Sequence, residues 1–272
     1  MIGLNKVLKS IRDRSFIQKV LNRLLSSKYV PAPHLAIDHY IANHYPNDGW
    51  QSLSLQARKV WTELSPVFDN KKINTIAYVG AHMGDTALAL DQAFPGREFY
   101  LLEPLPDLFK KLTEKTATHK NMHCLNVAAG SQETSLDMLV DNYAPASSLL
   151  PYEPIALQEF PFLGKQSTKK VIVKPLDNIL KECKASEIDL LLMDVQGYEN
   201  EVLQGAHQTL ASCKVVISEL SLVPLYVGSS TFDSVYKTLL CNFFNLEYLI
   251  NPIKGTSQQV LQVDGVFIRT EE

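Results

Sequence analysis

Short apolar runs alternate with helical segments along the chain from about residue 70 onward. Residues 73–79 form an apolar run closed by glycine, residues 85–94 have helical spacing, and residues 98–102 form a second apolar run. Parallel strands need long connections, which helices usually supply. The alternation therefore predicts an α/β fold with a mostly parallel sheet covered by helices on both faces. Further helices are expected at 106–118, 177–183, 199–210 and 231–243, and further strands at 123–129, 171–173, 188–194 and 215–220.

The chain ends with two expected strands, 246–250 and 263–269, joined by a loop that contains Pro252 and Gly255. Ahead of the α/β region, prolines and a turn-forming stretch separate short helical pieces. We therefore expect an N-terminal helical extension over residues 1–70 and one larger domain over residues 71–272.

The bulk composition is that of an ordinary globular protein. Hydrophobic residues make up 46% of the 272 residues, and the formal net charge is −3. This charge produces no global positive field, so no nucleic-acid partner is expected. The four cysteines are widely spaced and form no C-x-x-C pair, which favours reduced thiols in a cytoplasmic protein. No constellation in the sequence requires a metal.

The first 28 residues are strongly basic. Seven Lys and Arg residues stand against the single acid Asp13, and leucines recur between them at roughly helical spacing. A basic amphipathic helix can lie on an anionic membrane surface, which allows a peripheral membrane contact. The alternative is a helix that packs on its own domain or on a twin subunit in a homo-oligomer. The sequence favours this second interpretation only slightly.

Residues 144–170 are the least regular part of the α/β region. Four prolines and Gly164 interrupt the segment, and three aromatic residues lie among them, Tyr152, Phe160 and Phe162. A loop of this length inside a compact domain is usually functional or disordered. The aromatic residues argue against disorder, so the segment is interpreted as a lid or an acceptor-binding loop.

Three motifs follow expected strands. The first is Tyr78-Val79-Gly80-Ala81-His82-Met83-Gly84, a glycine turn that joins a strand to a helix. Glycines allow a cofactor to approach the backbone closely, and a helix N-terminus offers N–H groups to a carboxylate or phosphate. The second is Glu103-Pro104, 19 residues past Gly84. An acid beside the glycine turn can accept hydrogen bonds from both hydroxyls of a ribose.

The third motif is Met193-Asp194-Val195-Gln196-Gly197-Tyr198-Glu199, which follows a very apolar run. Polar groups that end a buried parallel strand lie at the carboxyl edge of the sheet, where open α/β folds bind ligands. Asp194 or Glu199 can also serve as the cap of the next helix. Both interpretations can hold together.

With these motifs in this order, the sequence resembles the FkbM-type methyltransferases, which methylate hydroxyl groups on sugars and natural products. The likeness covers roughly residues 73 to 269, and the D-x-Q-G-Y-E segment from Asp194 to Glu199 is its most specific part. The other matching pieces are Val79-Gly80-Ala81, Glu103-Pro104, Ala128-Ala129-Gly130, Ser147-Ser148-Leu149-Leu150, Pro175-Leu176-Asp177, Val202-Leu203-Gln204-Gly205-Ala206, Ser218-Glu219-Leu220-Ser221-Leu222, Pro224-Leu225-Tyr226 and the closing 261–267.

The resemblance implies a Rossmann-like class I methyltransferase fold, with a seven-stranded sheet and a C-terminal antiparallel pair, that binds S-adenosylmethionine. The implied cofactor-binding residues are Tyr78, Gly80, Ala81, Gly84, Glu103, Pro104, Ala128 and Asp194. Two positions depart from the family pattern, which usually has aspartate at Tyr78 and asparagine at His82. The aspartate helps to hold the methionine part of the cofactor, whereas tyrosine carries no charge at neutral pH.

Methyl transfer to a hydroxyl requires alignment of the reacting atoms and a base for the hydroxyl proton. The candidates at the sheet edge are Asp194, Glu219 and His82, with Asp194 first by position. Asp194 can instead orient the acceptor or the methionine of the cofactor. Two other functions stay open: an NAD(P)-linked oxidoreductase or epimerase, which the missing G-x-G-x-x-G disfavours, and a non-catalytic binding module, for which Tyr78 is the best argument.

Overall fold

The computed structural model describes Leu64 and residues 67–185, 187–256 and 258–270. The predicted basic helix and almost all of the predicted extension over residues 1–70 lie outside this part of the chain, so both stay predictions. Residues 67–71 are helical. Leu64 and Phe68 are both buried and pack with Ile73 in the core.

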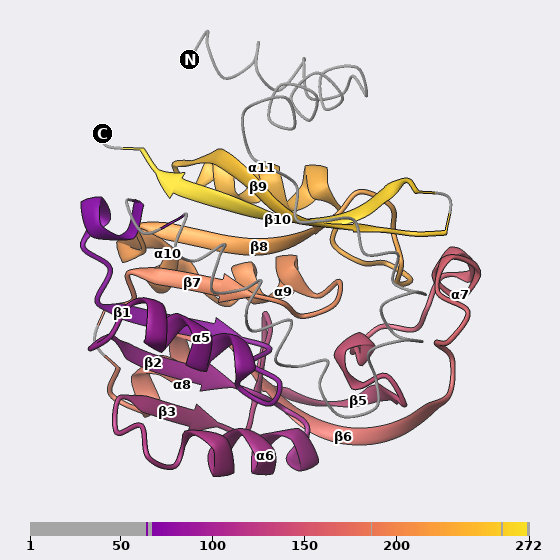
Figure 1. Ribbon diagram of the computed structural model, residues 1–272, viewed down its shortest axis with the longest axis horizontal. Helices are drawn as coiled ribbons and strands as arrows, with labels where there is room; N and C mark the ends of the chain where they lie inside the picture. The colour runs from indigo at the N-terminus through magenta and orange to yellow at the C-terminus, as the bar shows by residue number, and fades with distance from the viewer. Residues whose placement is uncertain (1–63, 65–66, 186, 257, 271–272) are drawn as a thin grey trace, which may run out of the picture.

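A seven-stranded sheet forms the centre of the molecule, with the strand order β3-β2-β1-β7-β8-β10-β9 (Figure 1). The five strands from β3 to β8 run parallel, and β10 and β9 follow as an antiparallel pair. This order confirms the predicted class I methyltransferase fold. The strands are β1 (Thr75–Val79), β2 (Glu98–Leu102), β3 (Met122–Leu125), β7 (Leu190–Met193), β8 (Val215–Ser221), β9 (Phe244–Lys254) and β10 (Val260–Arg269).

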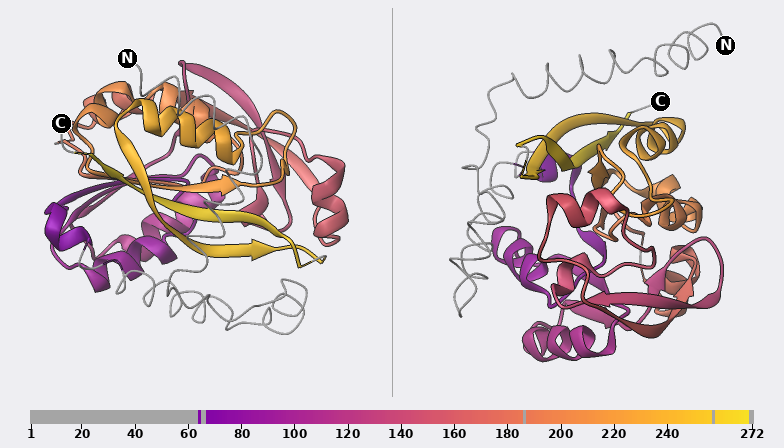
Figure 2. Two further views of the ribbon diagram at one scale, coloured as in Figure 1. Left: turned by 90° about the horizontal axis from the view of Figure 1, so that it is seen from above. Right: turned by 90° about the vertical axis from the view of Figure 1, so that its right-hand side faces the viewer.

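Helices cover both faces of this sheet, as the alternation predicted (Figure 2). Successive residues of a strand point to opposite faces, so Ala77 and Val79 pack in one core layer while Ile76 and Tyr78 pack in the other. Because both faces are covered, every residue of β1 and β7 is buried. One face carries α5 (Asp85–Ala93) and α6 (Pro106–Thr116), and the other carries α8 (Leu176–Glu182), α9 (Glu199–Gln204), α10 (His207–Ser212) and α11 (Phe232–Cys241).

A second sheet of three strands, in the order β4-β6-β5, lies beside the main sheet. The sequence predicted one strand over 123–129, but the structure divides it between β3 and β4 (Ala128–Ala129), which belong to different sheets. The predicted strand 171–173 is the end of β6 (Gln166–Lys174) and lies outside the main sheet. Strand β5 (Thr134–Asp141) was not predicted, although its Leu136, Met138 and Val140 recur at every second position and pack inward.

Two predicted segments are more finely divided in the structure. The helix expected at 199–210 breaks at Gly205, where a side chain would overlap the backbone carbonyl oxygen of Gly130. The irregular segment 144–170 contains a 3-10 turn, η1 (Ala144–Ala146), and a short helix, α7 (Pro154–Glu159), before β6 begins. Both elements begin beside a proline, which is tolerated in the first turn of a helix.

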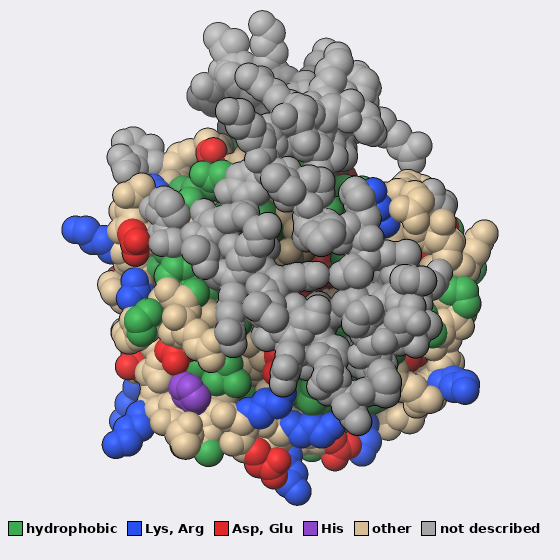
Figure 3. Space-filling view, viewed as in Figure 1, with side chains coloured by type: hydrophobic (Ala, Val, Ile, Leu, Met, Phe, Trp, Pro, Cys, Tyr) green, Lys and Arg blue, Asp and Glu red, His purple; other side chains and the backbone are tan. Residues whose placement is uncertain are grey.

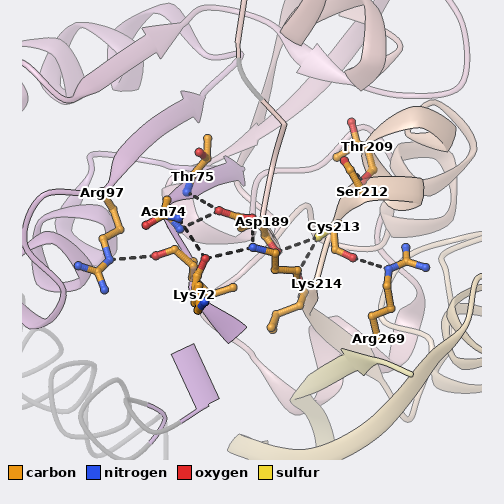
Figure 4. Close-up of polar contacts among 12 residues, drawn as sticks. Lys72, Asn74, Thr75, Arg97, Asp189, Thr209, Ser212, Cys213, Lys214 and Arg269 are labelled. Carbon is orange, nitrogen blue, oxygen red and sulfur yellow. Dashed lines mark hydrogen bonds and ion pairs between the residues drawn. The ribbon is translucent and has the colours of Figure 1, made fainter. Parts of the chain in front are cut away.

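A polar network joins strands β1, β7 and β8 at the amino edge of the sheet (Figure 4). The Asp189 carboxylate accepts backbone N–H bonds from Asn74 at 2.8 Å and from Thr75 at 3.2 Å. Lys214 Nζ lies 2.6 Å from its other oxygen and also donates to the Lys72 carbonyl oxygen. The network satisfies backbone groups that precede β1 and fixes the start of the parallel strands.

Lys and Arg side chains gather along the lower edge in Figure 3, where α6 and β6 lie. Several of them pair with acids, including Lys169 with Asp107 at 3.6 Å and Lys170 with Asp137 at 3.5 Å. Exposed pairs of this kind contribute about 0–1 kcal/mol each. No helix within the described ranges is both long enough and apolar enough to cross a membrane.

Candidate active site

A cavity of about 370 Å³ opens at the carboxyl ends of β1, β2, β7 and β8. Open α/β folds bind ligands at this edge, and the volume is within the range of small-molecule sites. Nine of the ten predicted site residues line the cavity, and Gly84 is the exception. The nine are Tyr78, Gly80, Ala81, His82, Glu103, Pro104, Ala128, Asp194 and Glu219.

The glycines of the first turn serve packing within the protein. Gly80 has φ +86°, and a side chain there would overlap the carbonyl oxygen of Asp194. Gly84, the N-cap of α5, also has φ +86°, and a Cβ would lie 2.7 Å from Leu112 Cδ1 of α6. The N–H groups of Gly80 and Ala81 both donate to the Leu102 carbonyl oxygen, at 3.0 and 2.9 Å. The glycines therefore allow β1, β7 and α6 to meet closely, a role that the sequence did not reveal.

Glu103 joins the loop that follows β1 to the loop that follows β2. Its Oε2 accepts the His82 N–H at 3.0 Å, and its Oε1 accepts the Leu105 N–H at 2.9 Å. The side chain is 4% exposed, and burial raises the pKa of its carboxyl to about 7. From its place in the loop after a strand, this acid would be expected to be exposed with little structural role, and the structure contradicts that expectation. Each oxygen retains a second lone pair that can accept a hydroxyl from the cavity.

Tyr78 and His82 are both neutral near pH 7. Burial, followed by the charge of Asp194, raises the pKa of the Tyr78 phenol, whose hydroxyl interacts with Thr86. Burial lowers the pKa of His82 to about 4, so its imidazole is a weak proton acceptor. The left-handed φ of His82, +51°, aims its N–H at Glu103. The geometry therefore suits His82 to shaping the glycine turn better than to removing a proton.

Asp194 and Glu219 converge on the amide of Gln196. Its Nε2 donates to Asp194 Oδ1 at 2.6 Å and to Glu219 Oε2 at 3.2 Å, and Gln262 Nε2 donates to the same Glu219 oxygen at 2.7 Å. Asp194 is open to the water of the cavity, but the walls surround it closely enough that burial raises the pKa of its carboxyl. Burial and the charge of Asp194 raise the pKa of Glu219.

Glu199, the first residue of α9, holds the loop that precedes this helix. Its carboxylate is buried and accepts the Gly197 N–H at 3.1 Å, just ahead of α9. Tyr198 is the N-cap of α9, and no side chain among the described residues caps this helix. Asp194 lines the cavity, as the position of the third motif at the sheet edge predicted, whereas the prediction that Asp194 or Glu199 caps the next helix was wrong. No group of three or more His, Cys, Asp and Glu residues in the described part of the chain is placed to hold a metal ion.

Aromatic side chains form the outer wall of the cavity. Tyr152, Phe160 and Phe162, which the sequence placed in a lid or acceptor-binding loop, all line it, together with Tyr143 and Tyr226. The ring of Tyr152 lies 5.3 Å from that of Tyr226, and the two residues form a β-bridge. Ser148 Oγ donates to the Gln196 carbonyl oxygen at 2.8 Å, which ties the segment before α7 to the loop of Asp194.

Residues 79–249, more than half of the chain, match the family model described as the methyltransferase FkbM domain. The chain belongs to the FkbM methyltransferase family. This match confirms the family that the motifs indicated and, with it, the predicted class of enzyme, an S-adenosylmethionine-dependent methyltransferase. It gives no support to the oxidoreductase alternative.

The FkbM chain is 25% identical to the 2-O-methyltransferase NoeI of Sinorhizobium fredii over 167 residues, which are 59% of this chain and 69% of NoeI. Likenesses to solved structures are weaker. Magnesium protoporphyrin IX methyltransferase of Synechocystis is 12% identical with a TM-score of 0.46, over 86% of this chain and 89% of that one. Fibrillarin of Aeropyrum pernix is 13% identical with a TM-score of 0.43, over 72% of this chain and 66% of the fibrillarin chain. The strand order defines the fold independently of these scores.

The residues of the FkbM chain suit the chemistry of S-adenosylmethionine, which carries a ribose, a positive sulfonium and an overall positive charge. The described residues that line the cavity include four acids, Asp85, Glu103, Asp194 and Glu219, and no Lys or Arg. A buried carboxylate with a lone pair that points into the cavity can accept a hydrogen bond from a hydroxyl group, and its charge can stabilise a cation. Glu103 would hold the ribose, and Asp194 would face the charged end.

Four polar residues that shape the cavity were not predicted as site residues from the sequence: Gln196, Gln262, Tyr143 and Tyr226, which are among its lining residues. Gln196 stands inside the most specific motif and Tyr226 inside Pro224-Leu225-Tyr226, so a signal existed for both. Gln262 and Tyr143 lie in β10 and just before η1, with no local pattern that marks them. Their approach to the cavity depends on the tertiary fold.

Proposed function

We propose that this FkbM chain transfers the methyl group of S-adenosylmethionine to a hydroxyl oxygen of a sugar or natural-product acceptor. The observation that carries the proposal is the carboxylate of Asp194, which faces the cavity between the Glu103 side and the aromatic wall. A hydroxyl must lose its proton as it accepts a methyl group, and a positioned carboxylate can receive it. NoeI, a 2-O-methyltransferase by name, supports oxygen as the accepting atom.

The cofactor supplies an activated methyl group when bound, so the protein mainly has to bind, orient and exclude water. Glu103 would fix the ribose through its free lone pairs. Asp194 would hold the acceptor hydroxyl by accepting its hydrogen bond at Oδ2 and would take the proton there. Tyr152 and Tyr226 would hold the body of the acceptor against their rings, since aromatic faces bind apolar surface and sugar rings.

The charge of the cavity also selects the acceptor. With four acids and no Lys or Arg among its described lining residues, the cavity disfavours a phosphate or carboxylate close to the reacting hydroxyl. We expect the reacting part of the acceptor to be uncharged. When a small-molecule extract is incubated with enzyme and methyl-labelled cofactor, the labelled product should pass through an anion exchanger. Retention of all label on the exchanger would contradict this expectation.

The test of the base is Asp194→Asn, which keeps the shape of the side chain and removes its charge. Turnover should fall by roughly a hundredfold or more, as for a lost general base. Calorimetric titration with S-adenosylmethionine separates this effect from lost cofactor affinity, and Glu219→Gln is the control for removal of a neighbouring negative charge. If Asp194→Asn keeps near-wild-type turnover while folded, Asp194 is not the base, and Glu219 is the next candidate, since His82 is a weak proton acceptor.

A further inference from the structure

The side chain of Gln196 has a partner at each end of its amide. Nε2 donates to Asp194 Oδ1 at 2.6 Å and to Glu219 Oε2 at 3.2 Å, while Oε1 accepts the hydroxyl of Tyr226 at 2.8 Å. Its backbone carbonyl oxygen accepts Ser148 Oγ at 2.8 Å, and its φ is +52°. A residue held by four hydrogen bonds in the left-handed region has a fixed position.

The partners also fix which way the amide points. An ionised carboxylate can only accept hydrogen bonds, so the NH₂ group must face Asp194 and Glu219. The opposite orientation would place the amide carbonyl oxygen against the acceptor oxygen Oδ1 of Asp194. Tyr226 is 2% exposed, and its hydroxyl lies 2.8 Å from Oε1 and 3.1 Å from the Ala146 carbonyl oxygen, both acceptors. With Oε1 on this side, the phenol can donate its proton over the shorter of these two distances, which stabilises the same orientation.

We propose that Gln196 is a positioning residue that keeps Asp194 in its ionised, proton-accepting form, and that Tyr226 sets the direction of the amide. The bond to Oδ1 leaves Oδ2 as the oxygen available to an acceptor hydroxyl. This inference rests on the proposed role of Asp194 as the base. Gln196 and Tyr226 act through Asp194 and need not touch the reacting atoms.

The titratable groups that surround this pair are acids and a tyrosine. Glu103 approaches from the end of β2, Tyr78 from β1, Glu199 from α9 and Asp264 from β10, beside Glu219 in register. Burial raises the pKa of Asp194, and burial with the charges of the neighbouring acids raises that of Glu219, whereas the Gln196 bond lowers the pKa of Asp194. The Gln262 amide donates to Glu219, and the described lining residues include no Lys or Arg, so the Gln196 amide carries this role for Asp194.

The direct test follows the carboxyl groups themselves by NMR of the full chain labelled with ¹³C at Asp and Glu carboxyls, without cofactor or acceptor. The Asp194 signal is the one missing from Asp194→Asn. In Gln196→Leu we expect its titration midpoint to move upward by about one pH unit, which is about 1.4 kcal/mol. In Tyr226→Phe the midpoint should move in the same direction by less. Gln208→Leu, at an exposed position of α10, is the matched control and should leave it unchanged.

An unchanged or lowered midpoint in Gln196→Leu would overturn the proposal, and an unchanged midpoint in Tyr226→Phe would remove Tyr226 from it. If Gln196→Leu does not fold, Gln196→Asn withdraws the donor with a smaller change and the same expected shift. Activity supplies a second readout. The acidic limb of the methyl-transfer pH profile should move up in Gln196→Leu, so that higher pH restores turnover, whereas Asp194→Asn should show no rescue. Suppose that the midpoint shifts in Gln196→Leu while Asp194→Asn stays active. Asp194 would then not be the base, but Gln196 would still be shown to stabilise its ionised form.

Discussion

The carboxylate of Glu103 has a structural role, to which we add the proposed role of binding the ribose. Its two oxygens accept the N–H groups of His82 and Leu105, which belong to the loops on either side of the cofactor end of the cavity. Sequence position was enough to place an acid beside the glycine turn. It was not enough to show the burial or the two backbone bonds, because both depend on how the loop after β2 folds back on the turn after β1.

Glu103→Ala should therefore lower both stability and cofactor affinity. The variant leaves two backbone N–H groups without an acceptor, at about 1–3 kcal/mol each where water cannot replace it. Binding of S-adenosylmethionine should weaken by at least about tenfold, which is about 1.4 kcal/mol. The stability and the cofactor affinity of Glu103→Gln should lie between those of wild type and Glu103→Ala, since one oxygen of the amide still accepts a hydrogen bond. Thermal melting and calorimetry measure the two effects, and an alanine variant that binds as tightly as wild type would disprove the ribose assignment.

Gly80 offers a second test at the residue scale. Gly80→Ala should destabilise the protein and weaken cofactor binding, because the new Cβ meets the Asp194 carbonyl and displaces the end of β7. Gly96→Ala is the matched control: its φ is +82°, but nothing lies within 4 Å of its Cβ. Both variants carry the backbone strain of roughly 1–3 kcal/mol, so the excess loss in Gly80→Ala measures the clash. Equal melting temperatures would contradict the packing role.

At the scale of elements, the network of Asp189 and Lys214 at the amino edge of the sheet should contribute to stability but not to cofactor binding. Asp189→Ala removes the acceptor of two backbone N–H groups and the partner of Lys214. We expect a loss of roughly 1–3 kcal/mol in the free energy of unfolding, measured by urea denaturation. Cofactor affinity should be unchanged at temperatures where the variant is folded, because the network lies at the opposite edge from the cavity. A variant with wild-type stability but weakened binding would contradict this division.

The elements that the sequence predicted well are those with an uninterrupted pattern. Residues 98–102 form β2 as predicted, and α5 and α6 begin where expected. The errors fall where long-range packing decides. Contact with Gly130 splits α9 from α10 at Gly205, and residues 123–129 are shared between two sheets. The omission of β5 was avoidable, because Leu136, Met138 and Val140 show the two-residue period of a half-buried strand.

For the molecule as a whole, buried acids predict opposite effects of pH on folding and binding. Burial raises the pKa of Glu103 and Glu199 from 4.5 to about 7, and that of Asp264 from 3.8 to about 7. The folded protein then binds more protons than the unfolded chain between these values, so the free energy of unfolding falls as pH rises through that range. Ribose hydroxyls donate to ionised Glu103, so cofactor affinity should rise over the same range.

Melting curves with and without S-adenosylmethionine measure both trends. The protein alone should melt at a higher temperature near about pH 6 than near about pH 8, and the stabilisation by the cofactor should be larger near about pH 8. In Glu103→Gln, which cannot ionise there, the cofactor effect should lose most of its pH dependence. Parallel curves for the wild type across this range would contradict the coupling of Glu103 to the cofactor.

The basic N-terminal segment, residues 1–28, has no role in the proposed reaction within the cavity. Its seven Lys and Arg residues among leucines support a proposed contact with an anionic membrane surface or with a second subunit. Removal of residues 1–28 should leave cofactor binding intact and reduce sedimentation with anionic vesicles. If full-length and truncated proteins sediment alike, the membrane contact is excluded, and the mass of each in solution tests the subunit contact.

Under the proposed function, the protein transfers the methyl group of S-adenosylmethionine to an oxygen atom in the cavity that Asp194 lines. The most direct measurement uses S-adenosylmethionine labelled with ¹³C in its methyl group, incubated with the protein and a fractionated extract of the source cell. The carbon resonance of a methyl group on oxygen is distinct from one on nitrogen, sulfur or carbon. We predict a methoxy resonance that wild-type protein produces and Asp194→Asn does not. A transferred methyl on another atom would contradict the claim, as would a folded wild-type protein that transfers none.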